Sequence, residues 1–229
     1  MVLKNKTDYN YNNVPTYLYD DNPFNDVQYI FNKDVLLDDT LEVIKYNLQG
    51  RKNTDMDNYS EWGSLYPSGR EAVLRNYRTP KKKAEVQKEF SEEDAQNVRK
   101  NVEENVLEMV KAHPDTTFYF YTPPYSVVWW YARQCSGNLL RYFEAEKLQA
   151  EMLLEYDNVK LYSFTDMFDL TQNLDNYKDD KHYNAEISEK IIDWIYEGTG
   201  LITKENYEER INKMEDFYLN QVSESSFSE

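Results

Sequence analysis

The sequence predicts an α/β fold: a partial three-layer sandwich with a small parallel sheet flanked by helices, preceded by a helical and irregular N-terminal region. Two segments rich in β-branched and aromatic residues, 116–122 (TTFYFYT) and 158–164 (NVKLYSF), have the composition of strands. Apolar residues recur at helical spacing before, between and after them, over 91–112, 136–156 and 184–198. Strands that alternate with helices of crossover length indicate a parallel sheet with helices on its faces.

The first part of the chain predicts less regular structure. Residues 1–15 are polar, rich in Asn and Tyr and without periodicity, so we expect a loose segment. A helix is expected to begin at Pro23, with Asp21 or Asn22 as its cap. A second helix is expected within 38–50, where a glycine ends the apolar periodicity.

The remaining boundaries follow from composition. Residues 51–83 contain glycines, prolines and a basic run, which predicts a long surface excursion with a short helix at 69–77. A last helix is expected over 203–219, and 221–229 reads as a flexible tail. The span 16–220 is therefore predicted to form a single domain.

Composition and charge exclude several classes of function. The chain has 42 acidic and 26 basic residues, a net charge of -16, which disfavours nucleic acid and anionic membranes as partners. A single cysteine, Cys135, excludes an internal disulfide and a multi-cysteine metal site. No apolar run approaches the roughly 18 residues of a membrane-spanning helix, and the N-terminus has no signal-peptide core. We expect a soluble chain without a cofactor.

One motif carries possible chemistry: His182, with Asp179 three residues earlier, follows the second predicted strand and precedes a helix start at Asn184. A histidine is a general base near neutral pH if a carboxylate orients its ring. Chemistry in parallel sheets collects at the carboxyl ends of strands, where this loop is expected. The alternatives are a polar loop that caps a helix, or a divalent metal held by Asp179, Asp180 and His182, which are few ligands for a metal.

The same stretch resembles a known family. DDKHYNAEIS after NVKLYSF resembles the C-terminal block of the SGNH (GDSL-like) hydrolases, and the span from PTYLYDDNPFNDV to NYEERI resembles the C-terminal two-thirds of membrane-anchored SGNH-like proteins of Gram-positive bacteria. The resemblance implies that His182 is the base and that Asp179 orients it. It further implies ester groups of cell-envelope glycans as substrates of an esterase or acyltransferase, and an extracytoplasmic place for the full-length family.

The chain departs from the family pattern at the nucleophile. No G-x-S block precedes residue 15, and Gly137-Asn138 is followed by Leu139 where the family has aspartate in a G-x-N-D block. Three serines remain as candidates, none on a recognisable strand-to-helix elbow: Ser64, Ser126 and Ser163. We therefore expect a truncated enzyme or a chain that has lost the activity, inactive in isolation.

A second hypothesis is a non-catalytic module that binds a carbohydrate or a protein. The stretch YSVVWWY after the first strand offers Tyr125, Trp129 and Trp130 for stacking on sugar rings. We name these three, with Ser126 and Tyr183, as candidate substrate-binding residues. The competing interpretation is that the aromatic residues bury a helix start against the sheet.

Overall fold

The computed structural model describes residues 15–51, 66–78 and 83–228. The chain divides into two compact units: of the described residues, 15–51 belong to the first unit, and 66–78 and 83–228 belong to the second. The chain passes from the first unit to the second within the predicted excursion, 51–83. Of the predicted loose segment at the start of the chain, Pro15 alone is among the described residues.

The first unit is formed by short helices. These are η2 (Thr16–Tyr19), α1 (Val27–Ile30), η3 (Asp34–Asp39) and α2 (Thr40–Leu48). The helix expected from Pro23 begins at Val27 instead, because the preceding residues form turns in which the Asn22 side chain accepts the Phe24 N–H. The helix expected within 38–50 is present and ends before Gly50, whose φ is 65°. None of the described side chains of this unit is buried.

The second unit contains a three-stranded sheet with the order β1-β2-β3. Strands β1 (Phe118–Thr122) and β2 (Val159–Ser163) are parallel, as the sequence predicts. The two-residue strand β3 (Leu201–Ile202) pairs antiparallel with β2 and was not expected. The sheet is therefore mixed, and its parallel pair joins the two predicted strands.

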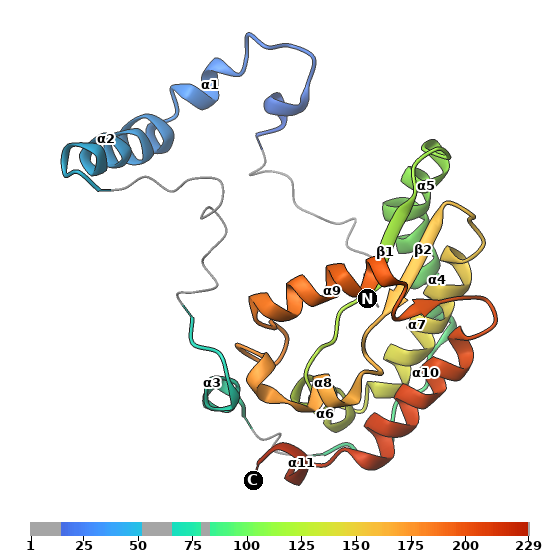
Figure 1. The fold of residues 1–229 in the computed structure, drawn as a ribbon. Coiled ribbons are helices and arrows are strands. Elements are labelled where there is room, and N and C mark those ends of the chain that lie inside the picture. Colours follow the sequence, from blue (N-terminus) through green and yellow to red (C-terminus); the bar gives the residue numbers. More distant parts are fainter. Residues whose placement is uncertain (1–14, 52–65, 79–82, 229) are drawn as a thin grey trace. The chain divides into compact units, whose positions relative to one another are not determined.

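Helices cover both faces of this sheet (Figure 1). On one face the strands pack against α4 (Glu92–Val102) and α7 (Leu139–Leu153), which also contact each other. On the other face Tyr162 of β2 packs against Ile187 of α9 (Ala185–Glu197). The predicted three-layer arrangement of a small sheet between helices is confirmed.

The second unit contains nine other helical segments in its described residues. They are α3 (Arg70–Asn76), η5 (Glu103–Leu107), α5 (Glu108–Ala112), α6 (Val127–Cys135), α8 (Phe168–Gln172), η6 (Leu174–Asn176), α10 (Tyr207–Asp216), η7 (Phe217–Gln221) and α11 (Ser225–Ser228). Of these, α10 packs against α7.

Helix α4 begins with a capping box, at the position that the sequence predicts. The Ser91 hydroxyl accepts the Asp94 N–H at 3.1 Å, and the Asp94 carboxylate accepts the Ser91 N–H at 3.1 Å. Asp94 is buried and also accepts a hydrogen bond from Arg141 Nε of α7 at 2.9 Å. One carboxylate thus fixes the start of α4 and ties it to α7.

The end of the chain is packed where it is described, although a flexible tail was expected. Residues 225–228 form α11, and Phe227 is 1% exposed. The Phe227 ring lies edge-on to Tyr77 and Tyr131, with centroid distances of 5.4 and 5.3 Å. Apolar burial of this kind holds the segment against the unit.

Candidate active site

The D-x-x-H motif lies in a tight loop just before α9. Tyr177 and Tyr183 form an isolated antiparallel bridge, and the Lys178 N–H donates to the His182 carbonyl at 2.7 Å. The chain therefore reverses direction between the two tyrosines. The Asn184 side chain then accepts a backbone N–H from the first turn of α9, which starts the helix as predicted.

Asp179 and His182 are paired within this loop. Asp179 Oδ1 accepts the backbone N–H groups of Lys181 and His182, each at 2.8 Å. Asp179 Oδ2 lies 2.6 Å from His182 Nδ1. A carboxylate can only accept a hydrogen bond, so it selects the tautomer with a proton on Nδ1 and leaves the Nε2 lone pair as the basic atom.

The same contacts set the charge of Asp179. Partial burial raises the pKa of its carboxyl, but the hydrogen bonds from the His182 backbone, the His182 ring and Lys181 outweigh that cost, and the pKa lies below its usual value. Asp179 is therefore an ionised carboxylate at neutral pH. The His182 side chain is 63% exposed, so a substrate can reach its ring.

Three hydrogen bonds hold the loop at the carboxyl end of β1. The Tyr177 hydroxyl donates to the Pro124 carbonyl at 2.6 Å. The Asp180 carbonyl accepts the Ser126 hydroxyl at 2.8 Å and the Ser126 N–H at 3.2 Å. Because β1 ends at Thr122, the pair lies beside the end of a parallel strand, the edge where sites collect in α/β sheets.

Ser126 is a structural residue in this arrangement. Its side chain is fully buried, donates to the loop that carries the pair and accepts the Trp129 N–H as the cap of α6. The expected role of Ser126 as a substrate contact or nucleophile is not supported. Its hydroxyl is buried away from any substrate and is already hydrogen-bonded to the Asp180 carbonyl.

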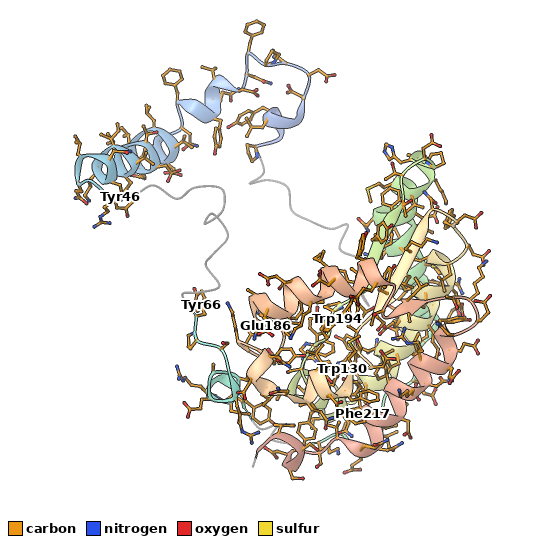
Figure 2. All side chains as sticks on the ribbon, in the orientation of Figure 1. Tyr46, Tyr66, Trp130, Glu186, Trp194 and Phe217 are labelled. Carbon is orange, nitrogen blue, oxygen red and sulfur yellow. The ribbon has the colours of Figure 1, made fainter. Side chains whose placement is uncertain are left out.

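The two tryptophans of the candidate set are core residues. Trp129 is 6% and Trp130 2% exposed. The Trp130 ring stacks on Phe143 and Tyr218 at centroid distances of 4.9 and 5.0 Å, and Figure 2 labels it in the body of the unit. Their burial matches the competing interpretation, in which the aromatic residues bury the start of a helix.

Tyr125 and Tyr183 remain as partly exposed candidates. The Tyr183 hydroxyl lies 3.3 Å from the Tyr121 hydroxyl on β1. The pKa of Tyr183 is raised, mainly by burial and also by this hydrogen bond. The Tyr125 ring packs on Trp129 with a centroid distance of 4.7 Å, and burial raises the pKa of the Tyr125 phenol too. Both phenols are therefore neutral hydrogen-bonding groups near the loop at any physiological pH.

A cavity of about 190 Å³ borders the carboxylate of the pair. Its lining includes Asp179, Asp180, Tyr77 and Arg78, with apolar side chains from α3 and α6. Sequence reasoning missed Tyr77 and Arg78, which lie in the predicted excursion. The Gly69 N–H donates to the Tyr177 carbonyl at 2.8 Å and brings this segment to the loop.

Among the described residues, His182 Nε2 has no hydrogen-bond partner, and no serine hydroxyl contacts the ring. Ser163, the last residue of β2, is buried, and Ser64 lies outside the described residues. The described residues also contain no group of three side chains suited to a metal ion, so the metal interpretation gains no support from Asp179, Asp180 and His182.

No protein-family model, curated protein or solved structure matches this chain. In the described residues, no helix combines the length and the apolar character needed to cross a lipid bilayer.

Proposed function

We propose that this chain supplies the histidine–aspartate pair of an SGNH-like serine esterase or O-acyltransferase that acts on ester groups of cell-envelope glycans. The observation that carries the proposal is the 2.6 Å contact between Asp179 Oδ2 and His182 Nδ1, in a loop tied to the end of β1. The resemblance of this stretch to the family block supports the same roles.

In this mechanism His182 Nε2 takes the proton of a serine hydroxyl as the oxygen attacks the ester carbonyl. Asp179 stabilises the imidazolium that forms and keeps the ring oriented. The imidazolium then returns the proton to the departing alcohol oxygen. The sequence contains no G-x-S block, and among the described residues no serine contacts His182. On this account we expect the chain alone to have no serine-dependent ester hydrolysis.

Two observations test the proposal. DNA on the 5′ side of the Met1 codon is expected to encode a G-x-S block, in the same or an adjacent reading frame. In a chromogenic acetyl-ester assay, the chain and its His182→Ala variant are expected to have equal rates. A G-x-S block missing from that DNA, or a serine-dependent rate from the chain alone, would contradict the proposal.

The alternative of a binding module based on the stretch after β1 is disfavoured. That hypothesis needs Trp129 and Trp130 at the surface, and both are buried.

A further inference from the structure

A second cavity, open to solvent and about 510 Å³ in volume, lies between α9 and the segment that follows β2. This volume is typical of sites for small organic ligands. One wall is formed by residues 166–170 and Asn176, and the other by Ile187, Lys190 and Trp194 of α9. Figure 2 labels Trp194 on this helix. The two walls are joined in sequence by the loop that carries the D-x-x-H motif.

Three polar side-chain groups of this lining have no hydrogen-bond partner in the described part of the chain. They are the Trp194 indole N–H, the Asp169 carboxylate and Asn176 Oδ1. The Asn176 side chain is held in place, because its Nδ2 donates to the Leu170 carbonyl at 3.1 Å. A ligand would therefore meet one free donor and two free acceptors without breaking existing bonds.

The charged side chains that line the cavity disfavour an anionic ligand. Asp166 accepts two hydrogen bonds from Arg210, at 2.6 and 2.9 Å, and Lys190 pairs with Glu186 at 2.6 Å. These opposite charges offset one another, which leaves the Asp169 carboxylate as the unpaired charge of the lining. A neutral ligand rich in hydroxyl groups suits this set, since hydroxyls donate to carboxylate and amide oxygens and accept from an indole N–H.

The apolar part of the lining points to a ring. Trp194 and Phe168 supply aromatic surface, and Leu170 and Ile187 supply aliphatic surface. The C–H face of a pyranose ring packs on such surfaces while its hydroxyls face the polar groups.

We propose that this cavity binds a neutral saccharide ring, with Trp194 as its apolar platform and Asp169 and Asn176 as acceptors for its hydroxyl groups. The inference rests on the proposed function in one respect: a glycan ester presents such rings next to the reacting group. The cavity then anchors the glycan, and the connecting loop carries the base that acts on it.

The test is a calorimetric and tryptophan-fluorescence titration of the full chain with chitotriose, a neutral trisaccharide. We expect saturable binding with a change in tryptophan emission. Asp169→Ala is expected to weaken binding about tenfold or more, because a hydrogen bond to a charged group is lost. Trp194→Phe is expected to lose the emission change. Tyr196→Ala is the matched control: this tyrosine lies on the same helix, is 93% exposed and does not line the cavity.

Three results would overturn the saccharide site: no saturable heat with chitotriose, equal affinity in Asp169→Ala, or tighter binding of the anionic trigalacturonate. Asp169 is exposed, so its variant is expected to unfold at an unchanged urea concentration and to report on binding alone. The titration does not measure ester hydrolysis. If the saccharide binds but no serine is activated by His182, the proposed function alone is refuted. If His182 activates a serine but the saccharide does not bind, the saccharide site alone is refuted.

Discussion

Replacing Ser126 with alanine tests whether this residue fixes the loop that carries Asp179 and His182. The substitution removes the hydroxyl that donates to the Asp180 carbonyl at 2.8 Å and caps α6 at the Trp129 N–H. It leaves the hydrogen bond from the Ser126 N–H to the same carbonyl, at 3.2 Å. The loop is therefore expected to loosen without being released.

The magnitude follows from the two lost contacts. A neutral hydrogen bond contributes about 1 kcal/mol net, and an N-cap contributes about 1 kcal/mol. The Asp180 carbonyl keeps one donor, so its full desolvation cost is not added. We expect the free energy of unfolding to fall by about 2 kcal/mol, which lowers Tm by roughly 4–8 °C for a unit of this size.

Urea denaturation measures the free energy of unfolding, and amide hydrogen exchange measures the opening of the loop. Exchange of the Lys181 and His182 amides is expected to accelerate in Ser126→Ala. The control is Ser136→Ala, which removes an exposed hydroxyl near the end of the same helix and is expected to change stability by less than about 0.5 kcal/mol. A loss below about 0.5 kcal/mol in Ser126→Ala, or unchanged exchange at these amides, would refute the reasoning.

Three further predictions concern stability. Hydrogen bonding to Arg141 holds the pKa of Asp94 below its usual value, so the contribution of Asp94 to the free energy of unfolding is present above pH 3.8 and is lost as pH falls through the folded-state pKa. The urea midpoint should therefore fall less steeply between pH 7 and 3 in Asp94→Asn than in the wild type. The same pH dependence of the midpoint in both proteins would contradict this. Burial raises the pKa of Glu146 from 4.5 to about 7, so the free energy of unfolding should decrease as pH rises between these values. The decrease, measured by urea titrations at each pH, should be smaller in Glu146→Gln. The same decrease in the variant and the wild type would disprove this. Phe227→Ala should cost about 3–5 kcal/mol by urea denaturation, against less than about 0.5 kcal/mol for the exposed Tyr196→Ala, and equal costs would mean that the tail is not packed.

Local signals in the sequence predicted the features that depend on near neighbours. The two parallel strands carry their β-branched and aromatic composition within seven residues each, and the helical segment expected from residue 91 begins there, with a capping box between Ser91 and Asp94. The Asp179–His182 pair is also local, because a side chain that accepts N–H groups two and three residues ahead closes a turn that brings the ring to the carboxylate.

Features that depend on distant contacts could not be predicted in this way. Ser126 bonds a carbonyl 54 residues later, and Gly69 bonds the Tyr177 carbonyl from within the excursion. Strand β3 has two residues, too few for a periodic signal, and it exists through its pairing with β2. Burial of Trp129 and Trp130 depends on how α6 packs, whereas their composition alone suits a surface or a core equally.

The most direct test of the proposed base is labelling of a serine by a fluorophosphonate probe, which reacts with activated serine hydroxyls. The chain is co-expressed with the segment encoded on the 5′ side of Met1. We expect labelling of a serine in that segment, abolished by His182→Ala and weakened by Asp179→Asn. Labelling that persists at full strength in His182→Ala, or no labelling with the wild-type chain, would contradict the assignment of His182 as the base of a serine esterase.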